Sequence, residues 1–411
     1  MNRSHAFPTP SRSFAHHWQL DPEVVFLNHG AFGACPTTVL EAQQAFQRQL
    51  EREPLRFVMR EYEPLLDHAR TVLADFVGAA PANLVFVPNA TTGVNSVLRS
   101  LSFSPGDELL TTNHAYNACC NALRFVAERS GAKVVVAEIP FPLALDLQTA
   151  EAQIHQAILS QVSPRTRLVM LDHVSSPTAL IFPLRSLIQA LAAQGIETLI
   201  DGAHAPGMLP LNLETLGATY YTGNCHKWLC APKGAGFLYV QPERQSQIRP
   251  LTISHGANAN RTDRSRFQLE FDWTGTQDYS AYLAVATAID YLDNLLPQGW
   301  ADVMTHNRLL ALQAREILCN ALEQPLPCPA EMVGAIAAVP LPTRFGIPEA
   351  MTSEIDPLQD WLWEIYQIEV PIVPLFNPAR KLIRVSAQIY NDLEQYHYLA
   401  HALQQRLKDL D

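Results

Sequence analysis

The sequence lacks the long apolar runs, dense basic runs and paired cysteines that mark several classes of protein. No stretch approaches the roughly 18 apolar residues that a membrane-spanning helix requires, so we expect no membrane insertion. The first twenty residues hold no continuous apolar segment, which argues against a secretory signal. Lys and Arg number 29 against 40 Asp and Glu, a formal net charge of -11. Without a basic cluster to offset that charge, nucleic acid is not an expected partner.

The cysteines also lack a pairing pattern. There are 7, an odd number, and none stands in C-x-x-C spacing. This usage indicates reduced thiols in a cytoplasmic protein. We expect no metal ligand set.

The composition is that of an ordinary globular protein. The chain has 411 residues, of which 48% are hydrophobic and 17% charged, and such a length suggests about two to three domains. Between residues 84 and 240, short β-rich runs alternate with segments of helical period, which predicts an α/β fold with a mostly parallel sheet covered by helices. The seven expected strands are residues 84–87, 108–111, 133–138, 167–171, 198–200, 219–222 and 236–240.

The pattern of alternating strands and helices ends after Gly275. Two long helices are expected over 279–296 and 300–319. A smaller α+β unit follows, with strands at 334–339, 370–373 and 382–386, a helix at 355–366, and a closing helix with Asn391 as N-cap. We therefore expect a large domain over 25–290 and a small domain formed by 1–24 and 291–411.

A lysine and a carboxylate mark the first candidate site. Asp201 ends one apolar strand and Lys227 follows another strand end, so both are expected at the sheet edge where open α/β sheets bind ligands. Pyridoxal phosphate (PLP) chemistry requires this pair, because the lysine forms a Schiff base and the carboxylate pairs with the pyridine nitrogen. The alternative is that Asp201 caps a turn and Lys227 is a solvated surface charge.

A phosphate site is expected nearby. The strand at 84–87 leads through a small polar turn into a helix that carries Thr91 and Thr92, and helix N-termini bind anions. The alternative is that Thr92 is only an N-cap. Neither G-x-G-x-x-G nor G-x-x-x-x-G-K-[ST] is present, so a monophosphate cofactor fits better than a dinucleotide or a nucleoside triphosphate.

These residues lie in segments that resemble the class V aminotransferase family of fold-type I PLP enzymes, and most closely its isopenicillin N epimerase group. The segments are FLNHGAFGACP, HVSSPTAL, DGAHAPG, HKWLCAPKGAGFLYV and DWTGTQDYSAYLA, and the match runs from Phe26 to the last helix. The resemblance implies a mostly parallel seven-stranded sheet sandwiched by helices, a smaller α+β C-terminal domain, PLP as cofactor, and a homodimer with shared active sites.

The resemblance also implies roles for single residues. Lys227 would hold the cofactor as an internal aldimine and move the proton at the substrate α-carbon, while Asp201 would pair with the pyridine nitrogen. His204 would contact the ring's phenolic oxygen; the alternative is a turn histidine bonded to backbone. The further cofactor contacts implied are Thr91, Thr92, Asn224 and His226 at the phosphate, Ser176 near the ring oxygen, His114 stacked on the ring, and Thr276 at the neighbouring subunit's phosphate.

On the substrate side, Arg384 is expected to grip the α-carboxylate through its fork of N–H groups. The alternative is a surface arginine on a strand edge. Asn28, His29 and Tyr116 are the other expected substrate-side groups. For His29 a structural role is the alternative, and Tyr116 is close enough in sequence to share the aromatic position assigned to His114.

We therefore expect an enzyme that acts at the α-carbon of an amino acid or amino-acyl compound, by epimerisation through the Lys227 aldimine and a quinonoid. Transamination and β-elimination of a carbon–sulfur bond use the same residues and are alternatives, and a catalytically silent PLP-fold protein is another. Epimerisation needs proton return on the opposite face, either by a second acid, for which His29 and Tyr116 are the candidates, or by a lysine that swings across. The stretch 371–384, where cysteine desulfurases of the family carry a nucleophilic cysteine, has none, which disfavours sulfur transfer.

Overall fold

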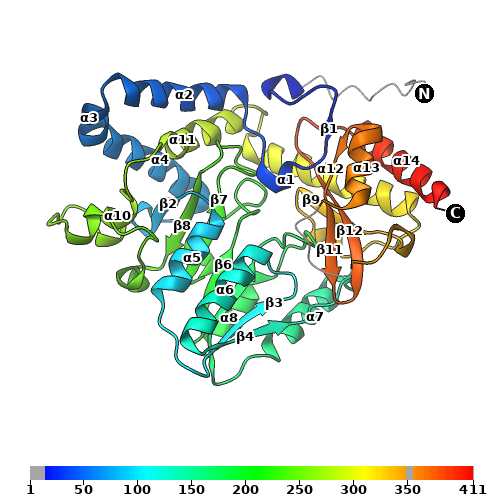
Figure 1. Cartoon of the computed structure of the whole chain (residues 1–411), viewed down its shortest axis with the longest axis horizontal. Helices are drawn as coiled ribbons and strands as arrows, with labels where there is room; N and C mark the ends of the chain where they lie inside the picture. The colour runs from blue at the N-terminus through cyan, green and yellow to red at the C-terminus, as the bar shows by residue number, and fades with distance from the viewer. Residues whose placement is uncertain (1–13, 349–354, 411) are drawn as a thin grey trace.

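Seven strands form the central sheet of the computed structural model, which describes residues 14–348 and 355–410 (Figure 1). The strand order is β2-β8-β7-β6-β5-β3-β4, and β8 alone runs in the direction opposite to the other six strands. All seven expected strands and the mostly parallel sheet are confirmed. Their bounds are β2 Leu84–Val87, β3 Glu108–Thr112, β4 Lys133–Ala137, β5 Thr166–Asp172, β6 Glu197–Asp201, β7 Tyr220–Asn224 and β8 Gly236–Val240.

Helices cover both faces of this sheet, because successive strand residues pack into two different hydrophobic clusters. Leu168 and Met170 of β5 lie in the cluster that includes α5 and α6, whereas Val169 and Leu171 lie in the cluster that includes α7 and α8. A strand buried on both faces has no polar side, which is why the run RLVML is continuously apolar after its first residue. The helices around the sheet are α2 Thr37–Arg52, α4 Tyr62–Val77, α5 Ala90–Ser100, α6 Asn117–Ser130, α7 Leu147–Leu159, α8 Leu184–Ala192, α10 Arg266–Phe271 and α11 Ser280–Asp293.

The chain after α11 builds the smaller unit. Long helix α12 (Trp300–Ala321) packs against α14 (Leu393–Asp409) and against an antiparallel sheet of order β11-β12-β9. The strand expected over 370–373 is shifted: residues 370 and 371 lie between β10, which ends at Glu369, and β11, which begins at Ile372 and continues to Phe376. The other elements are β9 Ile336–Pro340, β10 Ile368–Glu369, β11 Ile372–Phe376, β12 Ala379–Ser386 and α13 Pro357–Tyr366.

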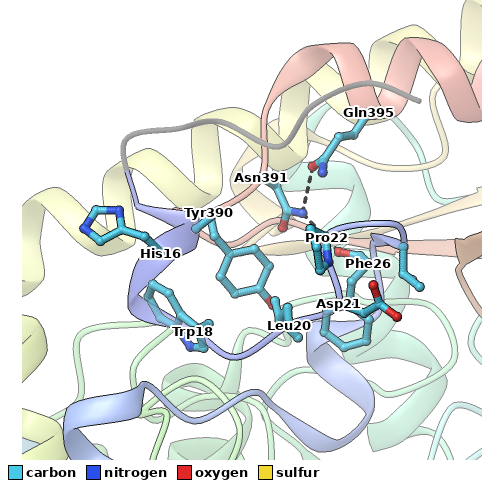
Figure 2. Close-up of a pocket in the computed structure, with 11 residues that line it drawn as sticks. His16, Trp18, Leu20, Asp21, Pro22, Phe26, Tyr390, Asn391 and Gln395 are labelled. Atoms are coloured by element: carbon cyan, nitrogen blue, oxygen red, sulfur yellow. Dashed lines mark hydrogen bonds between the residues drawn. The ribbon is translucent and has the colours of Figure 1, made fainter. Parts of the chain in front are cut away.

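The N-terminal segment joins this C-terminal unit (Figure 1). Strand β1 (Val25–Phe26) pairs in parallel with β10, and the ring of Trp18 meets that of Tyr390 edge-on at 5.0 Å (Figure 2). Between the two segments lies a pocket of about 370 Å³. Within the described residues, no helix is long and apolar enough to cross a membrane.

Asn391 is not the N-cap of the closing helix, as the sequence analysis expected. Asp392 caps α14 and forms a capping box with Gln395. The Asn391 side chain instead donates to the carbonyl of Phe26 at 3.0 Å and to Gln395 at 2.9 Å (Figure 2). Asn391 Oδ1, the atom that an N-cap would use as acceptor, instead accepts from the Gln388 amide at 3.0 Å, so the side chain holds the N-terminal segment and does not cap the helix.

Candidate active site

A cavity of about 220 Å³ opens at the carboxyl ends of β5, β6 and β7. Asp172 and Asp201 are the last residues of β5 and β6 and are register partners. Lys227 comes three residues after the end of β7. The topology therefore brings Asp201 and Lys227 into one cavity, at the sheet edge where α/β folds bind ligands. The other expected residues that line it are Thr91, Tyr116, Ser176, His204, Asn224 and His226.

Lys227 is buried beside His204. Its Nζ lies 3.2 Å from His204 Nε2, and Trp228 Nε1 donates to His204 Nδ1 at 3.4 Å. Burial, and then the charge of Arg384, lower the pKa of Lys227 to about 7. Near neutral pH a large fraction of this amine is therefore unprotonated, the form that attacks a carbonyl carbon. Because Nδ1 of His204 accepts a hydrogen bond from Trp228, the ring proton of neutral His204 lies on Nε2. From there it can be donated in a hydrogen bond to the unprotonated amine of Lys227.

The Asp201 carboxylate is held in a fixed orientation. Oδ1 accepts from the amide of Ala203 at 3.0 Å, and Oδ2 accepts from the Cys119 thiol at 3.1 Å. Burial and the neighbouring Asp201 charge raise the pKa of Cys119 well above its usual value, so the thiol keeps its proton and remains a donor. The sequence analysis assigned Cys119 no role, because its contact with Asp201 joins residues 82 positions apart.

The start of α5 forms the polar end of the cavity. Asn89 is the N-cap and accepts from the Thr92 amide and hydroxyl, while the Ala90 amide donates to Asn224. Thr92 therefore does not line the cavity, contrary to expectation, because its hydroxyl is turned toward the cap. Thr91 does line it. His226 also lines the cavity, and its Nδ1 donates to the Ala235 carbonyl at 2.8 Å.

Arg384 of β12 reaches this region from the small unit. It is 6% exposed and donates through Nη1 to the carbonyl and hydroxyl of Ser176, the latter at 3.0 Å. Burial lowers its pKa to about 10, so it remains a cation near neutral pH. Among the described residues its Nε finds no hydrogen-bond partner. Arg384 lines a second cavity, which shares Tyr116 and Ser176 with the first.

His114 is not brought to the cavity. The residue is fully buried, and its ring nitrogens are engaged by the Thr178 hydroxyl at 3.0 Å and the Ile139 carbonyl at 3.2 Å. It comes two residues after β3 ends and turns back into the core. Tyr116, 46% exposed, lines both cavities instead. The geometry supports Tyr116, not His114, as the aromatic side chain over the site.

Asn28 and His29 are likewise absent from the lining of the cavity. His29 is fully buried and bonded to the Tyr390 hydroxyl at 2.8 Å and the Lys227 carbonyl at 3.1 Å, and Asn28 donates to Glu369. This geometry favours the structural alternative for His29, whose ring holds the backbone of Lys227 in place. Because His29 does not line the cavity, it is not positioned to act there as the second acid. The same segment reaches the cavity through Ala31 and Phe32. Thr276 is exposed and does not line this chain's cavity.

Gly33 sets how closely the N-terminal segment approaches Lys227. It has a φ of +72°, and a Cβ there would lie 1.9 Å from the His226 carbonyl oxygen. We expect Gly33→Ala to destabilise the fold by about 1–3 kcal/mol, because both the backbone and the contact are strained. Urea unfolding measures this, with Gly195→Ala as control: Gly195 also has positive φ but open space around it. Equal losses in the two variants would show that the contact with His226 costs nothing.

Asp172 is a site residue that sequence reasoning missed. It is 2% exposed and lines the cavity, and among the described residues neither carboxyl oxygen makes a hydrogen bond of good geometry. Burial, and then the Asp201 charge, raise its pKa well above the usual value, opposed in part by the Tyr116 amide and Lys227. The signal was present, since Asp172 ends an apolar strand just as Asp201 does.

The raised pKa of Asp172 predicts a pH-dependent stability. A carboxyl whose pKa is raised by folding stabilises the native state at low pH and loses that contribution as pH rises through the folded-state pKa. Relative to Asp172→Asn, the wild-type apo-protein should lose up to about 1.4 kcal/mol for each pH unit above about 4. Urea unfolding of both proteins between pH 5 and pH 8.5 tests this, and parallel curves would contradict it.

Comparison with known proteins places this geometry in a family. The family model described as Aminotransferase class-V matches residues 25–336. The chain belongs to the class V aminotransferase family. The resemblance seen in the sequence is thus confirmed, and the enzyme depends on pyridoxal 5'-phosphate, the cofactor of the family.

The relatives within the family differ in their activity. Isopenicillin N epimerase of Streptomyces clavuligerus is 33% identical, covering 93% of this chain and 95% of the relative. A probable chloroplastic L-cysteine desulfhydrase of Arabidopsis thaliana is 28% identical, covering 96% of this chain and 85% of the relative. Among solved structures, a mutant of C-DES with glycine covalently linked to its PLP cofactor has a TM-score of 0.74 at 22% identity, covering 93% of this chain and 96% of that one. This last likeness supports the fold alone.

The residues present fit the cofactor of the family. Lys227 supplies a buried amine of lowered pKa, and Asp201 an oriented carboxylate. Thr91 and the start of α5 place a hydroxyl and a helix N-terminus at one part of the cavity, and such groups suit a phosphate. Bound there, the cofactor supplies an electron sink that stabilises negative charge at a substrate carbon.

Proposed function

We propose that the enzyme removes and returns a proton at the α-carbon of an amino acid or amino-acyl compound, and that its reaction is an epimerisation. The observation that carries the proposal is the convergence of three groups. Lys227 and Asp201 line one cavity, and Arg384 lines the adjoining one behind Ser176. An amine base, a fixed carboxylate and a buried guanidinium suit a substrate with an amino group and a carboxylate on the same carbon.

Each residue then has a defined task. Arg384 binds the substrate α-carboxylate through the N–H groups that Ser176 leaves unused. Lys227, with a pKa of about 7, takes and returns the proton at the α-carbon. Asp201, fixed by Ala203 and Cys119, would pair with the pyridine nitrogen of the bound cofactor. His204 keeps the Lys227 amine in place and would contact the ring's phenolic oxygen.

Tyr116 is the candidate for the second proton donor that epimerisation requires. It lines both cavities, and burial, with the Asp201 charge adding to it, raises the pKa of its hydroxyl. The hydroxyl therefore carries a proton near neutral pH and can serve as a proton donor to carbon.

A carbon–sulfur lyase is the second candidate. It is favoured by relatives named as L-cysteine desulfhydrases, including one of Arabidopsis thaliana that is 28% identical over 96% of this chain. Elimination needs the same α-proton removal and only a leaving group in addition. Transamination, which needs the same residues, is the third candidate reaction.

Product analysis separates these reactions. We expect the holoenzyme, given an accepted L-amino acid, to form the D-enantiomer, measured by chiral chromatography, without sulfide, ammonia or pyruvate. Sulfide and pyruvate from L-cysteine, with no D-product from any substrate, would establish the lyase instead. As a matched variant, Tyr116→Phe should abolish D-product formation while keeping α-proton exchange, and unchanged epimerisation by this variant would remove Tyr116 as the donor.

We further propose that the enzyme is a homodimer in which Thr276 binds the phosphate in the neighbouring subunit's site. Its exposed position on the Gly275–Thr276 turn, outside this chain's cavity, supports the proposal. Light scattering of the cofactor-bound protein should give the mass of a dimer, and Thr276→Ala should weaken cofactor binding about tenfold. A monomeric mass would contradict the shared site.

A further inference from the structure

Asp172 lines the cavity around Lys227 but has no task in the proposed reaction. We call this cavity, at the carboxyl ends of β5, β6 and β7, the Lys227 cavity. Asp172 ends β5, Asp201 ends β6, and the two residues are register partners in adjacent parallel strands. Their side chains therefore leave the sheet on the same face and enter the same space.

The two carboxyl groups differ in their hydrogen bonds. Asp201 accepts from the amide of Ala203 and from the thiol of Cys119. Asp172 is 98% buried, and both of its oxygens lack a hydrogen-bond partner among the described residues. A buried polar group costs free energy unless it finds a partner, in the protein or in a bound molecule. Asp172 thus has bonding capacity that a molecule in the Lys227 cavity can use.

The arrangement of the pair favours a neutral Asp172. Two carboxylates side by side in a buried site repel each other, so one of them tends to keep its proton. Hydrogen-bond donors stabilise the charged form, and of the two groups Asp201 has such donors while Asp172 makes no bond of good geometry with one. The proton of the pair therefore belongs on Asp172.

The other groups around Asp172 do not reverse this preference. Burial, and then the charge of its register partner, raise the pKa of Asp172 well above the usual value, against a smaller opposing effect of the Tyr116 amide and of Lys227. The neighbouring thiols of Cys119 and Cys120 keep their protons, because burial raises the pKa of both. They add no charge that would alter the balance.

We propose that Asp172 binds the cofactor as a neutral carboxylic acid, by donating a hydrogen bond to the ring end of the bound molecule. The inference rests on the cofactor position given under the proposed function, with the pyridine nitrogen at Asp201. As the register partner of Asp201, Asp172 belongs to that ring end, whereas the phosphate is assigned to Thr91 and the start of α5. A neutral donor fills the unused bonding capacity without adding a second negative charge beside Asp201.

The test is the affinity of the apo-enzyme for PLP at pH 7, measured by absorbance titration. We expect Asp172→Asn, whose amide still donates, to bind PLP within about threefold of wild type. Asp172→Leu has a side chain of similar shape without a donor and should bind PLP about tenfold more weakly. Wild-type affinity in Asp172→Leu would show that the acid makes no bond to the cofactor. A tenfold change in Asp172→Asn would show that its charge matters, and either result overturns the inference.

Inorganic phosphate, used as a competitor of PLP, locates the bond. It occupies only the phosphate end, so its inhibition constant should be the same for wild type and Asp172→Leu. Tenfold weaker phosphate binding in a folded Asp172→Leu would contradict a bond at the ring end. Glu197→Gln is the matched control: Glu197 is the first residue of β6, at the opposite edge of the sheet and outside the Lys227 cavity, and its replacement should leave PLP affinity unchanged.

Infrared difference spectroscopy of the holoenzyme at pH 7 detects the proton itself. Subtracting the spectrum of Asp172→Asn from that of wild type should leave the C=O stretch of a protonated carboxyl group, which shifts in D₂O. A carboxylate band in its place would overturn the inference. This measurement does not depend on the folding of Asp172→Leu.

The outcomes separate this inference from the proposed function. If wild type and Asp172→Leu bind PLP equally well, the role of Asp172 is contradicted, while the chemistry proposed at Lys227 stands. If wild-type apo-enzyme binds no PLP, the cofactor position is contradicted, and the inference with it.

Discussion

Replacing Lys227 with alanine should abolish both the visible absorbance of the lysine-bound cofactor and turnover. The variant loses the only amine that lines the Lys227 cavity among the described residues, and with it the nucleophile and the base for the α-proton. A general base alone contributes about 10²–10⁴ in rate, so kcat/KM should fall by about 10⁴ or more. The measurements are the absorption spectrum after gel filtration and single-turnover kinetics.

Lys233→Ala is the matched control for this variant. Lys233 lies six positions further along the same loop, is exposed and does not line the cavity. Its replacement should leave the spectrum intact and turnover within about threefold, as is usual for a surface change. Loss of absorbance in both variants would show that the loop, and not the Lys227 amine, is what the cofactor requires.

Asp201→Asn should bind the cofactor but turn over about a hundred- to a thousandfold more slowly. The amide keeps the size of the carboxylate but removes the charge that holds a proton on the pyridine nitrogen, and loss of one pre-oriented electrostatic group costs a factor of this order. Its spectrum should still show bound cofactor, with the pH dependence of the absorbance altered.

A second variant separates the charge of Asp201 from its geometry. Asp201→Glu retains the charge but displaces the oxygens from Ala203 and Cys119, and its rate should fall between those of wild type and Asp201→Asn. An Asp201→Asn enzyme at the wild-type rate would leave the carboxylate without an electronic role.

The sheet and the groups at its edge could be predicted from the sequence because their signals are local. An apolar run that ends on a polar residue predicts both a buried strand and a side chain at its carboxyl end, and this reasoning brought Asp201 and Lys227 to one cavity. The same rule applied one strand earlier finds Asp172, which was missed only because the expected strand was ended at Leu171.

His114 and His29, which the sequence assigned to the site, do not line the cavity. His114 lies in the turn after β3 and His29 begins a short helix after β1, and at such positions the direction of a side chain depends on which distant partner it meets. His29 is bonded to residues 361 and 198 positions away, Tyr390 and Lys227. His114 is fixed by Thr178, which is 64 positions away. No spacing rule reports such contacts, whereas Tyr116, two residues beyond His114, is carried into the cavities by the start of α6.

The most direct test of the account is exchange of the substrate α-proton for solvent deuterium by the holoenzyme, compared with its Lys227→Ala variant. For at least one amino acid that perturbs the cofactor absorbance, we expect the wild-type enzyme to place deuterium at the α-carbon and the variant to place none. If the wild-type enzyme binds amino acids but exchanges none of their α-protons, or if Lys227→Ala exchanges them at the wild-type rate, the proposed chemistry at the Lys227 cavity is wrong.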